Sequence, residues 1–165
     1  MNRRQIAAVL VLRELGIEPK MDFFRDRLVV QKALYLAQAA GCDLGYFYGW
    51  YLRGPYCSNV AEDMFAATEG PVDPEDAVQS FALDEESREC LAKIKELIAK
   101  RKQADLARCL ELLASVHFLV KRKQVPDFAA RTVTKRLKLF GKDFDVNQVQ
   151  AALRELRGAG VLDVA

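Results

Sequence analysis

The chain has 165 residues, 25 Lys and Arg against 23 Asp and Glu, and 51% hydrophobic residues. This composition is typical of a globular protein and excludes collagen, mucin, coiled-coil rods and acidic tails. The length suits one domain and buries enough apolar surface to fold without a metal or a disulfide. We therefore expect a single domain over residues 1–165 with no cofactor.

The chain has four widely spaced cysteines, Cys42, Cys57, Cys90 and Cys109. They form no Cys-x-x-Cys pair, and a single histidine cannot complete a zinc site, so we expect no bound metal. The apolar run near the N-terminus is interrupted by Arg13 and Glu14, and no stretch reaches the roughly 20 apolar residues that span a bilayer. We expect a cytoplasmic protein with reduced thiols and no membrane association.

The first part of the chain predicts two helices and then an aromatic strand. Residues 2–15 carry an apolar stripe. A helix over 23–40, with Asp22 as its N-cap, is apolar on most sides, which is typical of a helix at the centre of a core. The run 46–52 has five aromatic residues and no charge, which favours a strand or hairpin closed by a turn at 53–56.

Five further helices are predicted after this turn. Ser58 is expected to cap the third, which ends near Gly70, and residues 70–80 are expected to be an exposed loop. The remaining helices are expected at about 84–101, 104–122, 127–139 and 145–158, with Asp84 and Asp145 at the starts of the first and last of these. A short strand over 161–164 would close the chain. The predicted fold class is therefore mainly α, with about six or seven helices and a small β element.

No catalytic motif is present, and the sequence indicates that the protein is not an enzyme. Cys57 follows a Gly-Pro turn, and His117 could act as its base in a hydrolase. However, His117 lies on the apolar face of its predicted helix, where a packed core residue is the commoner interpretation.

Positive charge is concentrated in the second half of the chain. Residues 1–82 carry 8 Lys and Arg against 11 Asp and Glu, whereas residues 83–165 carry 17 against 12. Residues 121–142 contribute eight basic side chains against only Asp127. Two helices over 127–139 and 145–158 followed by a strand resemble the start of a helix-turn-helix unit. The nucleic-acid-binding candidates are Lys121, Arg122, Lys123, Arg131, Lys135, Arg136, Lys138 and Arg154. The alternative is a set of ordinary solvated helix faces.

The central segment supplies a second candidate site. Gln31 and Lys32 lie in an otherwise apolar helix, and a buried polar group costs free energy unless it is bonded, so we expect Gln31 to bond to another element. Arginine beside tryptophan and tyrosine is the composition of protein-binding hot spots. The partner-binding candidates are Trp50, Tyr51, Arg53, Gly54, Pro55, Tyr56, Gln31 and Lys32. The same residues could instead form a rigid turn in the core.

Three motifs resemble those of the YwgA-like proteins. They are L-x-x-Q-K-x-L-Y-L-x-Q at 28–38, W-Y-x-R-G-P-Y-x-S at 50–58 and LELLASVHFL at 110–119. The closing segment FDVNQVQAALRELRGAGVL at 144–162 is also similar. A narrower resemblance, limited to the Gln-Lys helix and the Gly-Pro turn after the tryptophan strand, relates the chain to the Panacea or SocA-like antitoxin and proteolytic-adaptor domains.

The resemblance implies a compact helical bacterial domain without enzymatic activity, in which residues 50 and 53–56 form the family motif. Panacea-type members bind a partner toxin, and one branch delivers it to a protease. The expected function is a protein-interaction module, antitoxin-like or adaptor-like, whose partner is a toxin-like or operon-neighbour protein, with homodimerisation open. The alternative is nucleic-acid binding through the basic C-terminal segment.

Overall fold

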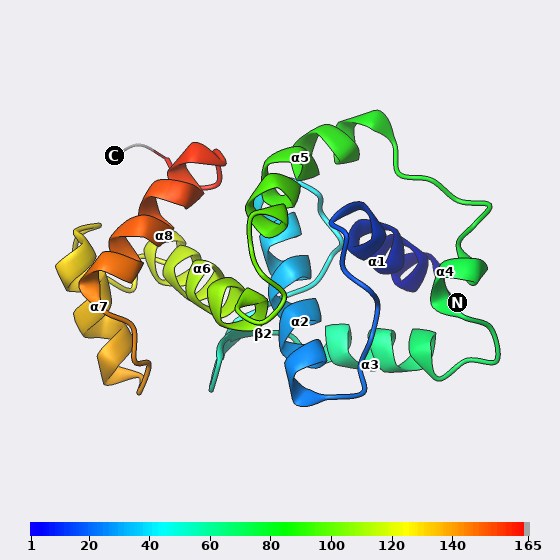
Figure 1. Ribbon diagram of the computed structural model, residues 1–165, viewed down its shortest axis with the longest axis horizontal. Coiled ribbons are helices and arrows are strands. Elements are labelled where there is room, and N and C mark those ends of the chain that lie inside the picture. Colours follow the sequence, from blue (N-terminus) through cyan, green and yellow to red (C-terminus); the bar gives the residue numbers. More distant parts are fainter. Residues whose placement is uncertain (164–165) are drawn as a thin grey trace.

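The computed structural model describes residues 1–163 and is mainly helical, as the sequence predicts (Figure 1). The described residues form eight helices and one two-stranded antiparallel sheet. In chain order the elements are α1 (Arg3–Glu14), α2 (Phe24–Ala39), β1 (Gly49–Tyr51), β2 (Gly54–Tyr56), α3 (Ser58–Thr68), α4 (Pro74–Ala77), α5 (Glu85–Ala99), α6 (Leu106–Lys121), α7 (Ala130–Leu139) and α8 (Val146–Gly158). Within this part of the chain no helix is long and apolar enough to cross a bilayer.

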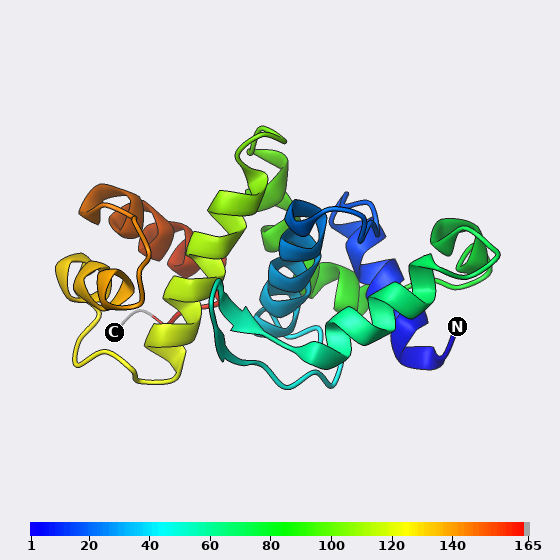
Figure 2. The same cartoon turned by 90° about the horizontal axis from the view of Figure 1, so that it is seen from below.

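Helices α2 and α6 pack against each other at the centre of the molecule. Residues 29–37 of α2 are all buried, and so are residues 110–120 of α6. Helices α7 and α8 lie on one side of this pair, and α1, α3 and α5 lie on the other (Figures 1 and 2). The buried apolar side chains of these helices form one continuous cluster. The central position that the sequence predicts for the second helix is therefore confirmed.

Polar caps fix the starts of α5 and α8 where the sequence places them. The Asp84 carboxylate accepts a hydrogen bond of 2.7 Å from the backbone N–H of Ser87. Asp145 and Gln148 form a reciprocal capping box, with bonds of 2.9 and 3.0 Å. Such caps satisfy backbone donors that the first helical turn leaves free.

Two predicted caps are wrong by one residue. Helix α2 begins after Phe23 rather than Asp22, because the carboxylate of Asp26 accepts from the backbone N–H of Phe23. Helix α3 begins after Cys57, and Ser58 is its first helical residue. Contacts outside the local sequence hold Cys57 extended, and they are described with the site below.

The aromatic run forms a hairpin, but its strand is shorter than predicted. Strand β1 pairs with β2 in the register Gly49 opposite Tyr56, and two residues connect the strands. Residues 46–48 lie outside the strand, although Tyr46 and Tyr48 are buried. Their apolar character therefore reflects packing against the helices rather than pairing in a sheet.

Two other segments differ from their predicted structure. The predicted loop at 70–80 contains the short helix α4, which begins at Pro74 with Asp73 as its N-cap. The predicted closing strand is not formed by residues 161–163, and residue 164 lies outside the described residues. Val161 and Leu162 are nevertheless buried, so packing against the core explains their apolar character.

His117 ties the segment after α8 to the two central helices. Its Nδ1 lies 2.7 Å from the hydroxyl of Tyr35 and its Nε2 lies 3.0 Å from the carbonyl oxygen of Val161. Because a carbonyl only accepts, Nε2 carries the proton and Nδ1 accepts from the tyrosine. Burial disfavours the charged imidazolium and lowers the pKa of His117 to about 4.

We expect this histidine to weaken the fold in acid. The unfolded chain binds the proton at its ordinary pKa of about 6.5, so between pH 6.5 and 4 unfolding takes up a proton. The free energy of unfolding should therefore fall by up to about 3 kcal/mol as the pH drops through this window. Urea unfolding of the wild type and His117→Gln at several pH values isolates the effect. Equal pH slopes for the two proteins would contradict it.

Candidate functional site

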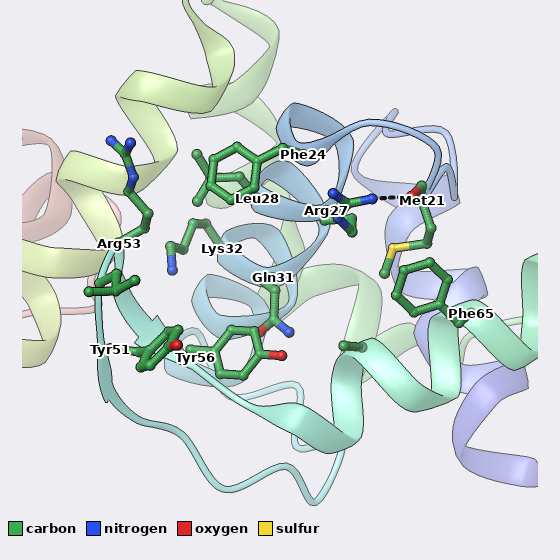
Figure 3. Close-up of a pocket in the computed structure, with 12 residues that line it drawn as sticks. Met21, Phe24, Arg27, Leu28, Gln31, Lys32, Tyr51, Arg53, Tyr56 and Phe65 are labelled. Atoms are coloured by element: carbon green, nitrogen blue, oxygen red, sulfur yellow. Dashed lines mark hydrogen bonds between the residues drawn. The ribbon is translucent and has the colours of Figure 1, made fainter.

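A groove of about 450 Å³ lies between the start of α2, the hairpin and α3 (Figure 3). Four aromatic rings line it: Phe24, Tyr51, Tyr56 and Phe65. Three cationic side chains also line it: Arg27, Lys32 and Arg53. None of the twelve lining residues, all in the described part of the chain, carries a carboxylate. The groove is therefore aromatic and positively charged.

One face of α2 supplies much of this lining. Phe24, Arg27, Leu28, Gln31 and Lys32 follow the spacing i, i+3, i+4, i+7 and i+8, which places them on one side of a helix. The sequence singles out only the last two of these residues. The first three could have been found by extending the same helical spacing backwards, and Phe65 on α3 carries no comparable signal.

Gln31 joins α2 to the chain beyond the hairpin, as expected of a buried amide. Its Nε2 donates to the carbonyl of Cys57 at 2.8 Å, and its Oε1 accepts from the Cys57 N–H at 3.1 Å. The side-chain amide of Gln31 thus bonds to both backbone groups of Cys57, as a neighbouring β-strand would. These bonds hold Cys57 in an extended conformation before α3. The bonds also fix the distance between α2 and β2, which sets the width of the groove.

Lys32 is a cation buried at the floor of the groove. The residue is only 1% exposed, and its Nζ donates to the carbonyl of Pro55 at 2.5 Å. Figure 3 shows its ammonium group directed toward the hairpin, on the side where Arg53 and Tyr51 lie. Burial is the main cause that lowers the pKa of Lys32 to about 7, and the nearby Lys142 adds to it.

A second buried lysine lies behind the hairpin and forms an ion pair with a carboxylate. The Lys142 Nζ is 2.6 Å from Oε1 of Glu111 and 3.4 Å from the carbonyl of Leu52. Arg53 approaches the other carboxylate oxygen of Glu111 only at 3.9 Å. Glu111 is therefore occupied by Lys142, and its attraction only partly offsets the burial of Lys32.

The partner-binding candidates divide into two groups. Five of them line the groove: Gln31, Lys32, Tyr51, Arg53 and Tyr56. Trp50 instead packs on the other side of the hairpin, with ring centroids 4.7 Å from Phe140 and 5.7 Å from Phe118. Gly54 and Pro55 are buried in β2. These three residues hold the hairpin in place and do not line the groove.

Two of the four groove-lining aromatic residues are more than half exposed to solvent. Tyr51 is 58% exposed, Phe24 is 57% exposed, and the neighbouring Leu52 is 75% exposed. The rings of Tyr51 and Tyr56 lie 5.4 Å apart. Contiguous exposed apolar side chains of this kind are typical of binding surfaces.

The basic candidates are distributed over several places. Arg131, Lys135 and Lys138 lie on one face of α7 and line a recess of about 430 Å³ with the exposed Leu139. Lys121 and Arg122 line a different recess beside residues 46–48. The other basic candidates line neither recess, and they are Lys123, Arg136 and Arg154.

The positive charge that residues 121–142 can offer to a ligand is also smaller than their composition suggests. Lys142, one of its eight cations, is buried and paired with Glu111. The guanidinium of Arg136 lies over the Phe140 ring, 5.1 Å from its centroid. The α7 face with its three cations is therefore the part of the stretch best placed to meet phosphates.

The cysteine hydrolase interpretation finds no geometric support. Cys57 is buried, and both ring nitrogens of His117 are occupied by Tyr35 and Val161. No nitrogen of His117 is free to take a proton from the thiol. In residues 1–163 no three His, Cys, Asp or Glu side chains gather as a metal site would require.

No known protein family and no curated protein matches the chain. The hypothesis of a YwgA-like or Panacea-like protein therefore rests on the motifs of the sequence.

Proposed function

We propose that this protein is a protein-interaction module that binds a segment of a partner protein in the groove. The supporting observation is that four aromatic rings and three cations converge on one concave surface without a carboxylate among its lining residues. Tyrosine and arginine are enriched in the residues that dominate binding energy at protein interfaces. The resemblance to antitoxin and adaptor domains favours a toxin-like partner, delivered to a protease in the adaptor case.

The protein acts in the bacterial cytoplasm by binding and not by catalysis. Its partner is an operon neighbour. A second copy of the chain is the other protein that the groove could accept, and the molecular mass in solution distinguishes a homodimer from a complex with a partner.

We expect Tyr51→Ala and Arg53→Ala each to weaken partner binding by about 2 kcal/mol, roughly thirtyfold in Kd. Both side chains are more than half exposed, so the thermal stability should change little. Phe47→Ala and Arg154→Ala are matched controls, because Phe47 is exposed outside the groove and Arg154 is exposed on α8.

The measurement is co-purification from the native host followed by titration of the recovered partner against all four variants. A partner that binds the groove variants and the control variants equally well would refute the proposal, and so would the recovery of no stoichiometric partner.

Nucleic-acid binding through α7 remains a second candidate function, favoured by the three cations on its exposed face. Replacing Arg131, Lys135 and Lys138 together by glutamine should weaken binding to duplex DNA and reduce the slope of log K against log salt by about 2–3. Arg53→Ala is the control and should leave the slope unchanged. Absence of wild-type binding at low salt would eliminate this function.

A further inference from the structure

Lys32 has unused hydrogen-bonding capacity where water is scarce. An ammonium group carries three donors, and the structure gives Lys32 a single acceptor, the carbonyl of Pro55. Removing a charge from water costs several kcal/mol unless a counter-charge and hydrogen bonds replace the lost hydration. A buried lysine with one neutral acceptor therefore lies in a site that an anion would complete.

The described part of the chain does not supply that anion. Glu111 is the carboxylate whose charge raises the pKa of Lys32, but its Oε1 lies 2.6 Å from Nζ of Lys142 and is paired with it. The groove itself brings two more cations, Arg27 and Arg53, and no acid. In the empty groove burial therefore favours the neutral amine, and a counter-charge that restores the ammonium form would come from whatever occupies the groove.

We propose that the groove receives the carboxylate at the end of a partner chain, with the ammonium group of Lys32 as its counter-ion and the aromatic rings around the last side chain. This inference rests on the proposed function and names the part of the partner that is recognised. The carboxylate accepts a hydrogen bond from Nζ of Lys32, which forms an ion pair, and no covalent bond forms or breaks.

The charge of the site suits a carboxylate better than a phosphate. A phosphate carries up to two charges and is commonly gripped by the forked donors of arginine. In this groove, Arg27 already donates through one nitrogen to the carbonyls of Met21 and Asp22. Arg53 is 59% exposed at the rim and Arg27 is half-buried, so Lys32 is the one fully buried cation among the three that line the groove.

The polarity of the lining favours a chain end over an acidic side chain inside a longer segment. A passing chain brings peptide groups on both sides of its carboxylate, and each of these needs hydrogen-bond partners. The polar atoms of Gln31 are already used by Cys57, and most of the remaining lining is apolar. A chain that ends in the groove brings peptide groups from one side only. The volume of about 450 Å³ also suits a few residues rather than a long segment.

The test uses acetylated tripeptides that end in Phe, Leu or Ala, each prepared as the free acid and as the amide. We expect at least one free acid to bind the full-length protein at least tenfold more tightly than its amide, as measured by calorimetry. Lys32→Met should abolish this preference. Lys138→Met is the charge-matched control on α7 and should retain it. A third set of peptides, amidated and with an internal Glu, tests the other source of a carboxylate.

The outcomes separate this inference from the proposed function. Equal binding of acid and amide, with loss of both in Tyr51→Ala, would overturn the role of the carboxylate and leave the interaction module standing. Equal binding of the internal-Glu amides would overturn the recognition of a chain end. Binding of none of the peptides would overturn the inference, whereas the proposed function would still be decided by co-purification. A direct spectroscopic readout is the titration of the Lys32 Cε resonance, which a bound acid should shift to higher pH and a bound amide should not.

Discussion

Gly54→Ala is expected to lower the free energy of unfolding by about 4 kcal/mol. Gly54 has φ of +90°, a conformation that costs a residue with a side chain roughly 1–3 kcal/mol. A Cβ at this position would also lie 2.3 Å from Oγ of Ser115 on α6, and relieving such overpacking costs a further 1–3 kcal/mol. The two effects act together because β2 lies directly against the central helix.

The chain offers a matched control and a rescue for this substitution. Gly45 has φ of +72°, but a Cβ added there would meet no heavy atom within 4 Å, so Gly45→Ala should lose only about 1 kcal/mol of stability. Adding Ser115→Ala to Gly54→Ala removes the hydroxyl and leaves a contact of 3.4 Å. The double variant should recover about half of the loss.

Denaturant unfolding of the wild type, the two single variants at positions 54 and 115 and the double variant gives the coupling energy between the two positions. If Gly54→Ala costs no more than Gly45→Ala, the close approach of β2 to α6 is not an energetic constraint. Because β2 forms a wall of the groove, the loss of stability should be accompanied by loss of partner binding.

The helices could be predicted because their signals are local. An acidic cap followed by apolar residues at helical spacing identifies α5 from Asp84 and α8 from Asp145 without any knowledge of the rest of the fold. The strand boundaries could not be predicted in this way. Tyr48 packs against α2, where its ring centroid lies 5.1 Å from that of Tyr35. Aromatic content alone does not distinguish this packing from pairing in a sheet.

The candidate site could be predicted only in outline. Gln31 and Lys32 stand out because polar residues are conspicuous in an apolar helix, whereas the direction in which each hairpin residue faces depends on distant partners. Trp50 faces away from the groove because its ring packs against Phe118 and Phe140.

The buried pair behind the hairpin was also hidden in the sequence. Lys142 appears there as one more cation of a basic stretch, and its partner Glu111 lies 31 positions away on the central helix. A contact of this kind is set by tertiary packing. The charge available on the surface is therefore smaller than composition indicates.

Lys32→Met is expected to stabilise the protein at neutral and acidic pH. Lys32 has a pKa of about 7 in the folded chain and about 10.5 when unfolded, so charging it in place costs the fold about 5 kcal/mol. Methionine removes that cost but leaves the carbonyl of Pro55 without its donor, a loss of about 2 kcal/mol. The variant should therefore gain about 3 kcal/mol below pH 7.

The sign of this effect should reverse in base. Between pH 7 and 10.5 the folded chain binds fewer protons at Lys32 than the unfolded chain, so the stability of the wild type rises with pH relative to the variant. The two stability curves should cross near pH 9, and above the crossing the wild type should be the more stable protein.

Urea unfolding of both proteins from pH 6 to 10 tests this, because the titrating groups that do not interact with Lys32 contribute equally and cancel in the difference. If the difference in unfolding free energy between the two proteins does not change with pH, Lys32 is hydrated and has the same pKa in the folded and unfolded chains. That result would also remove the physical basis for its role as a counter-ion. A stabilised variant that no longer distinguishes acid from amide peptides would instead show that the fold retains a destabilising charge at the place where a ligand uses it.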